Sequence, residues 1–116
     1  MANYSFPLDD VFLALGDPPR RAIVSRLVAG AASVKELAAP FAMALPSFLK
    51  HLNVLERGGL VRSRKIGRTR LCELEPAALR SAETWVAEQR AMWEAHTDRL
   101  AAYVEHLHDQ EKARDQ

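Results

Sequence analysis

Apolar residues recur at helical spacing through the first third of the chain and stop where glycine or proline stands. A first helix is predicted to end at Gly16, and its apolar positions are Leu8, Val11, Phe12 and Leu15. Asp17-Pro18 is typical of a helix start, because proline at the first helical position loses no hydrogen bond. The second helix should bury Ile23, Leu27 and Val28 and end near Gly30.

Two further helices are expected between residues 33 and 59. The segment Ser33-Val34-Lys35-Glu36 has the pattern of a capping box, and Pro40 keeps the helix that it opens short. The next helix carries one apolar stripe, made of Leu45, Phe48, Leu52 and Leu55. Because a single stripe holds this helix against the core, its other faces are available to a partner. Gly58-Gly59 should end it, since glycine tolerates the left-handed conformation of a helix C-terminus.

Two short runs after this helix, Leu60–Lys65 and Thr69–Glu75, predict a β-hairpin with arginines near its tip. Ile66 is a poor residue for a tight turn of the primed type. A longer loop is therefore expected, with Gly67 at positive φ.

After Pro76 one long helix is predicted to continue to about residue 109. Its seven-residue repeat consists of Leu79, Val86, Trp93, Leu100 and Leu107, with a companion row of Ala82, Gln89, His96 and Tyr103. This seam could pack on the chain's own domain, but a helix of about 30 residues spans about 45 Å, more than so small a domain covers. A second copy of the chain is the expected cover. Residues 1–109 should form the domain, and residues 110–116 a disordered tail.

The composition is that of a single globular domain, with 116 residues of which 48% are apolar and 27% charged. This length is short for an enzyme with a buried cleft. No apolar run approaches the roughly 18 residues of a membrane span, and no charged-then-apolar leader begins the chain. A cytoplasmic protein without membrane contact and without a cofactor is expected. The single cysteine, Cys72, fits a reducing compartment.

The net charge of +1 conceals a segregation along the chain. Residues 1–75 carry 11 Lys and Arg against 7 Asp and Glu (+4), while residues 76–116 carry 5 against 8 (−3). Six cations without an acid among them fall within residues 57–70, namely Arg57, Arg62, Arg64, Lys65, Arg68 and Arg70. Such a block is either a solvated face or a site for a polyanion.

Taken in order, these elements form a mainly α fold with a small β-hairpin. About five helices and a wing make a winged helix-turn-helix with a long C-terminal dimerisation helix. The major groove of DNA admits a helix such as the one with the single stripe, whose first turns then face bases and phosphates. Its candidate DNA contacts are Ser47, Lys50, His51 and Asn53, and those of the wing are Arg62, Arg64, Lys65, Arg68 and Arg70.

Four segments in this order resemble the ArsR/SmtB-type winged-helix repressors: LGDPPRR from Leu15, SVKELA from Ser33, PSFLKHL from Pro46 and VLERGGLV from Val54. The resemblance covers roughly residues 8–108. It implies a homodimer joined through its first and last helices, which binds an inverted-repeat operator in double-stranded DNA and represses genes until a signal, for instance an unidentified small-molecule inducer, releases it. The expected dimer interface consists of Leu8, Val11, Phe12, Val86, Trp93, His96, Leu100, Tyr103 and Leu107.

Two positions depart from the family pattern. Ala44 stands where members often carry a serine as the N-cap of the recognition helix, and the loss of such a cap costs about 1 kcal/mol. Leu49 stands where a small polar residue is frequent, so that an apolar contact, for example with a thymine methyl group, would replace a polar one. The operator preference is therefore left open.

Two other functions were weighed against DNA binding. Ser47-Phe48-Leu49-Lys50 is also an S-x-x-K pattern, but a Ser-Lys hydrolase needs a desolvated lysine, an oxyanion hole and a cleft. The S-D-N and K-T-G partners of that enzyme class are absent from the chain, and no enzyme activity is expected. The remaining alternative is a degenerate winged-helix dimer that acts as a protein–protein interaction module.

Metal binding is not expected at the two sites that the family uses. The thiolate site reads Glu36-Leu37-Ala38-Ala39 here, without cysteine. In the last helix His96 and His106 are one residue too close, because ten helical steps leave two side chains about 80° apart and eleven leave about 20°. A non-standard site formed by these histidines with Asp109 is left open. Cys72 is expected to pack in the core, with a redox role as the alternative.

Overall fold

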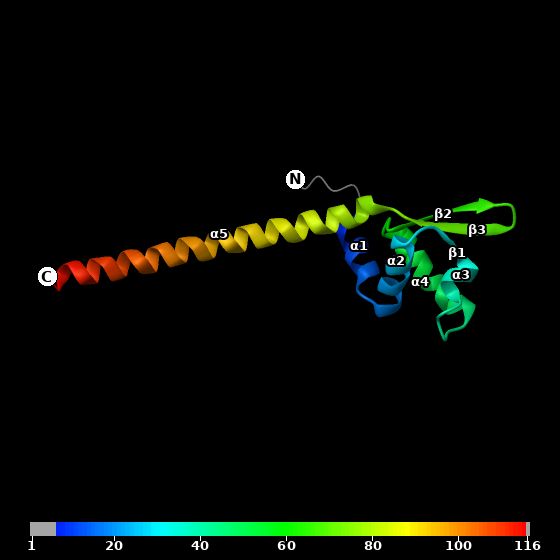
Figure 1. Cartoon of the computed structure of the whole chain (residues 1–116), viewed down its shortest axis with the longest axis horizontal. Helices are drawn as coiled ribbons and strands as arrows, with labels where there is room; N and C mark the ends of the chain where they lie inside the picture. Colours follow the sequence, from blue (N-terminus) through cyan, green and yellow to red (C-terminus); the bar gives the residue numbers. More distant parts are fainter. Residues whose placement is uncertain (1–6, 116) are drawn as a thin grey trace. The chain divides into compact units, whose positions relative to one another are not determined.

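The computed structural model describes residues 7–115, which contain five α-helices and three short strands (Figure 1). The helices are α1 (Leu8–Leu15), α2 (Pro18–Val28), α3 (Val34–Ala38), α4 (Leu45–Arg57) and α5 (Pro76–Arg114). The strands are β1 (Ala32–Ser33), β2 (Val61–Ile66) and β3 (Thr69–Leu74). The predicted fold class, mainly α with a small β wing and a long last helix, is confirmed.

The chain divides into two compact units, residues 1–83 and residues 84–116. The first unit contains α1 to α4, the sheet and the first turns of α5, whereas the described part of the second unit is the remainder of α5. The sequence predicts one domain over residues 1–109, so this division after Glu83 is a feature that the pattern does not contain.

The core of the first unit forms around the apolar stripe of α4. Phe48, Leu52 and Leu55 are each at most 1% exposed, and full burial of a side chain of this size contributes about 1.5–3 kcal/mol. The same cluster includes Val11, Ile23, Leu27, Leu37, Leu60, Val61, Cys72 and Ala78. Two residues depart from the predicted core: Leu45, the first residue of the stripe, is 55% exposed, and Val28, the last residue of α2, is 69% exposed.

The starts and ends of α1 to α4 follow the predicted signals with one exception. The Ser33 hydroxyl accepts a hydrogen bond from the Glu36 backbone N–H at 3.1 Å, and the Glu36 carboxylate accepts one from the Ser33 N–H at 3.3 Å, which completes the capping box. Gly59 follows α4 with φ of 74°, in the left-handed region. Asp17 occupies the N-cap position of α2, but its carboxylate makes no cap hydrogen bond.

The sheet has the order β1-β3-β2 and is antiparallel throughout. Ile66 pairs with Thr69, so the predicted longer loop is wrong and the hairpin turn consists of Gly67 and Arg68 alone. Gly67 has φ of 63°, as predicted, and glycine at the first central position permits a two-residue turn that keeps Ile66 in the strand. The strand β1 was not predicted, because two residues are too few to show an alternating pattern.

Helix α5 is 39 residues long and continues through Arg114, beyond the predicted end near residue 109. Residues 110–114 are Gln, Glu, Lys, Ala and Arg, all strong helix formers, and this explains why the alternating charges are helical. Near its start, α5 buries Ala78, Ser81 and Ala82 in the first unit. None of the helices among residues 7–115 has the length and hydropathy that a membrane crossing requires.

Candidate nucleic-acid interface

Helix α4 presents a polar face opposite its buried stripe. Ser47, Lys50 and Asn53, three of the predicted DNA contacts, are exposed. Within residues 7–115 none of the three has a hydrogen bond or ion pair to another side chain. Ala44 provides no side-chain cap, so the first backbone N–H groups of α4, at the positive end of the helix dipole, also lack a side-chain partner there.

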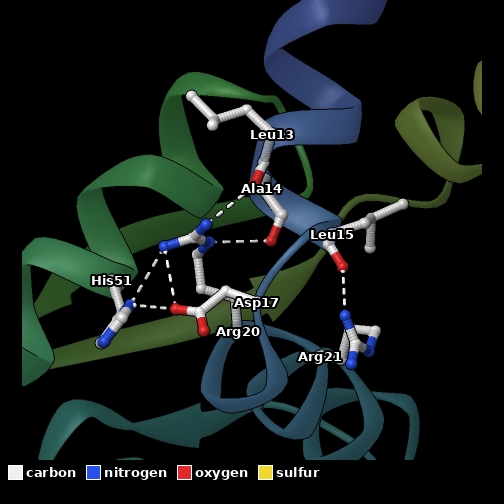
Figure 2. A network of polar contacts seen from close by, with 7 residues as sticks. All are labelled: Leu13, Ala14, Leu15, Asp17, Arg20, Arg21 and His51. Atoms are coloured by element: carbon white, nitrogen blue, oxygen red, sulfur yellow. Dashed lines mark hydrogen bonds and ion pairs between the residues drawn. The ribbon is translucent and has the colours of Figure 1, made fainter.

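The fourth predicted contact on α4, His51, belongs to a network inside the chain (Figure 2). Its Nδ1 lies 3.2 Å from the Asp17 carboxylate and 3.2 Å from the Nη1 atom of Arg20. The ring is half-buried, and Figure 2 shows its second nitrogen pointing away from both partners. Nδ1 is therefore satisfied within the chain, and only the outer nitrogen of His51 remains for DNA.

Arg20 connects this network to the end of α1. Its Nε and Nη2 atoms donate hydrogen bonds of 2.9 Å to the carbonyl oxygens of Ala14 and Leu13, and its Nη1 atom pairs with Asp17 at 3.2 Å. The Arg20 side chain is only 14% exposed. Charge-assisted hydrogen bonds of this kind are about twice as strong as neutral ones. The network thus fixes α4 relative to α1 and α2, which sets the direction of the polar face.

Three of the five predicted wing cations are held by carboxylates. Arg62 pairs with Glu75 at 3.3 Å and Arg64 with Glu73 at 3.1 Å, and both arginines are about two-thirds exposed. Exposed pairs contribute about 0–1 kcal/mol, so a phosphate can replace either carboxylate at little cost.

Arg70 is held more firmly than the other wing arginines. Its Nη2 donates to the Glu56 carboxylate of α4 at 2.5 Å, and its Nε donates to the Ser63 hydroxyl at 3.1 Å. Ser63 in turn donates to the same Glu56 oxygen at 2.5 Å. The Arg70 side chain, which is 38% exposed, therefore joins the wing to α4.

The wing tip carries the two cations that remain. Lys65 and Arg68 are both exposed, and among residues 7–115 neither has an ion-pair partner. Lys50 on α4 shares this property. The basic block of the sequence consequently divides into three arginines paired with carboxylates and three cations, Arg57, Lys65 and Arg68, that make no ion pair among residues 7–115.

A groove of about 390 Å³ lies between α3, the first turns of α4 and the wing. It is lined by Val34, Leu45, Leu49, Lys35, Arg68 and Thr69, among others. Lys35 is not among the DNA contacts predicted from the sequence, where it lies between the two residues of the capping box, Ser33 and Glu36. The pairing of β1 with β3 brings the start of α3 beside the wing, and only the fold reveals this contact.

The predicted seam on the second unit is exposed along its length. Val86, Trp93, Leu100, Tyr103 and Leu107 are between 45% and 65% exposed, and His96 is also exposed. From α1, Leu8 is half-buried and Phe12 is 37% exposed. Val11 differs from the other predicted interface residues, because it is fully buried in the chain's own core.

The other candidates for chemistry have simpler roles. Within the described part of the chain, no three His, Cys, Asp or Glu side chains are grouped so that they could hold a metal ion. Cys72 is fully buried in β3, and this burial raises the pKa of its thiol, an effect that Arg70 opposes and Glu56 reinforces. The thiol is therefore protonated and packs as a small apolar side chain.

Comparison with known proteins identifies the same region. The model of a family described as a helix-turn-helix domain matches residues 15–64. The HTH-type transcriptional regulator Rv2034 of Mycobacterium tuberculosis is 39% identical over 84 residues, which are 72% of this chain and 78% of that protein. The transcriptional repressor SdpR of Bacillus subtilis is 28% identical over 79 residues, 68% of this chain and 88% of that protein.

Two solved structures resemble this chain in both fold and sequence. The crystal structure of an ArsR family transcriptional regulator, RHA00566, is 50% identical with a TM-score of 0.75, over 81% of this chain and 97% of that one. The homodimeric winged helix-turn-helix DNA-binding domain of Mb0332 from Mycobacterium bovis is 26% identical with a TM-score of 0.57, over 73% of this chain and 81% of that one. With its recognition helix, its wing and these relatives, the chain belongs to the ArsR family of winged helix-turn-helix transcriptional regulators.

Proposed function

We propose that this DNA-binding regulator is a homodimeric repressor that places α4 in the major groove of an inverted-repeat operator and its wing on the flanking backbone. One observation carries the assignment of the site: the polar face of α4, with Ser47 and Lys50, is exposed and makes no ion pair among residues 7–115. Such a face supplies both base contacts and phosphate contacts.

The homodimer is supported by the seam of the second unit. Its large apolar side chains are about half exposed in one chain, and a soluble protein rarely leaves so many on one helix uncovered. Their seven-residue spacing is that of a helix that pairs with another helix. The Mycobacterium bovis relative, whose DNA-binding domain is homodimeric, supports the same assembly.

The symmetry of that assembly supports an inverted-repeat operator, and a relative supports the repressor role. A two-fold dimer presents two equivalent recognition helices, which fit half-sites about 34 Å apart. The Bacillus subtilis relative is a repressor, in keeping with this role.

The S-x-x-K segment supports a binding role rather than catalysis. Ser47 and Lys50 both lie on the exposed face of α4. A lysine activates a serine only when it is desolvated beside it, and an exposed lysine stays charged. We therefore assign this pair to DNA contacts and no enzyme activity to the chain.

The DNA contact is tested by titrating labelled DNA from upstream of the gene at two salt concentrations. Affinity should fall steeply with salt, and Lys50→Ala should weaken binding and reduce the slope of log K against log salt by about 2, because the dimer carries the substitution in both half-sites. Lys112→Ala, at the far end of α5, is the control and should change neither. An unchanged affinity for Lys50→Ala would show that α4 is placed wrongly, and a protein that binds no duplex would favour a protein–protein interaction module.

The dimer is tested by sedimentation of Leu100→Glu, which places a charge in the seam. This variant should sediment as a monomer or fail to fold, because a charge in an apolar interface is unpaired and desolvated. Ala102→Glu, outside the seven-residue rows, should remain dimeric. A dimer of unchanged stability for Leu100→Glu would contradict the seam.

A further inference from the structure

The first turn of the recognition helix carries an exposed apolar residue that the core does not use. Leu45 begins α4 and is 55% exposed, although the other three residues of its stripe are at most 1% exposed. Leu49, one helical turn on, is half-buried and packs on the edge of the core. The two side chains share one face of α4 and line the groove beside the wing together with Val34.

The groove is flanked by positive charge. Lys35 of α3 and Arg68 of the wing tip line it and are both exposed, and among residues 7–115 neither has an ion-pair partner. Arg70, which also lines it, is bound to Glu56. An apolar floor between unneutralised cations suits an occupant that is anionic at its edges and apolar at its centre.

DNA has this chemistry where its major groove contains thymine. The phosphates supply the anionic edges, and the 5-methyl group of thymine is the apolar group that base edges present in the major groove. We propose that Leu45, supported by Leu49, contacts a thymine methyl group in each operator half-site, while Lys35 and Arg68 contact the neighbouring phosphates. The proposal rests on the proposed placement of α4 in the major groove and adds the base that its first turn reads.

The experiment first selects bound sequences from a random duplex library with the full-length protein. Each thymine of the selected site is then replaced in turn by deoxyuridine, which removes the methyl group and keeps the base pair. At one thymine in each half-site, affinity should fall about fourfold, the value of one buried methyl-sized group. Replacement at the other thymines should have little effect.

Protein variants connect this effect to the groove. Leu45→Ala should bind the thymine and deoxyuridine sites equally, because its contact with the methyl group is lost. Leu13→Ala is the matched control: Leu13 is 57% exposed on α1, does not line the groove, and its substitution should preserve the fourfold difference. Lys35→Ala should weaken both sites equally and reduce the salt slope by about 2, because one phosphate contact is lost in each half-site.

The outcomes separate this proposal from the proposed function. If a salt-sensitive, sequence-specific complex forms but deoxyuridine is tolerated at every thymine, or the selected half-sites contain no thymine, the methyl contact is refuted and DNA binding stands. The same holds if Leu45→Ala retains the fourfold difference. If no sequence is enriched and no duplex binds, both proposals fail.

Discussion

The substitution Arg20→Ala tests whether the network behind α4 holds the recognition helix in place. The side chain of Arg20 is 14% exposed and donates two 2.9 Å hydrogen bonds to carbonyl oxygens at the end of α1. Hydrogen bonds that involve a charged group contribute about 1.5–3 kcal/mol each, so the lower value gives about 3 kcal/mol for the pair. Since domains of this kind are stable by about 5–15 kcal/mol, the loss is a large fraction of the total.

Urea denaturation at one fixed protein concentration measures this loss, because the stability of a dimer depends on concentration. With a slope of about 2 kcal/mol per molar urea, the midpoint should fall by about 1.5 M. Arg21→Ala is the matched control: Arg21 donates one bond of 2.8 Å to the Leu15 carbonyl, but its side chain is exposed, and the loss should stay below about 1 kcal/mol (Figure 2). Equal losses for the two variants would refute the role given to Arg20.

Three further substitutions test local features of the first unit. Ser33→Ala should lower the free energy of unfolding by about 1 kcal/mol through loss of the capping box, and an unchanged urea midpoint would contradict this. Gly58→Ala should cost about 1–3 kcal/mol in the same assay, because the new Cβ would lie 2.8 Å from the Asp10 carbonyl oxygen, whereas at Gly16 the nearest atom is 3.3 Å away and the cost should be smaller. Burial raises the pKa of the Cys72 thiol, so the folded state keeps a proton that the unfolded chain releases near pH 8.5. The free energy of unfolding of the wild type should therefore fall relative to that of Cys72→Ala as pH rises above that value. Parallel plots of stability against pH for the two proteins would contradict this.

The sequence predicts the parts of the fold that depend on neighbours along the chain. The stripe of α4 and the Ser33 capping box each lie within a few turns of one element, so spacing alone reveals them. The predicted longer loop is wrong because it assumes that Ile66 occupies a turn position, for which it is a poor residue. The structure places Ile66 in β2, and Gly67 takes the positive φ. The spacing of Leu45 predicts a core position, but the buried part of α4 begins one turn later, at Phe48.

The sequence predicts which elements form the candidate site, but not which of its side chains pair with others in the chain. The sequence predicts that α4 and the wing form the site and that every arginine of the wing contacts DNA. Which arginines meet a carboxylate depends on strand register and on the approach of α4 to the wing, as with Arg70 and Glu56, fourteen positions apart. His51 illustrates the same limit, because its partners lie 31 or more positions away, Arg20 in α2 and Asp17 at the N-cap of α2.

The arginines bound to carboxylates and the cations without an ion pair have different proposed roles, the first in holding the wing in place and the second in affinity for DNA. The Arg70 guanidinium, bound to Glu56 and Ser63, holds the wing against α4. It can lie there because the Glu56 carboxylate neutralises its charge. A cation that gains affinity from DNA must instead be uncompensated before binding, since it acts by displacing counterions from phosphates. Lys50, Lys65 and Arg68 meet that condition among residues 7–115, and all three stand on elements whose positions the compensated groups determine. Net charge alone would therefore misjudge the proposed interface, because Glu56, Glu73 and Glu75 each cancel an arginine in the total while they hold that arginine in place on the wing.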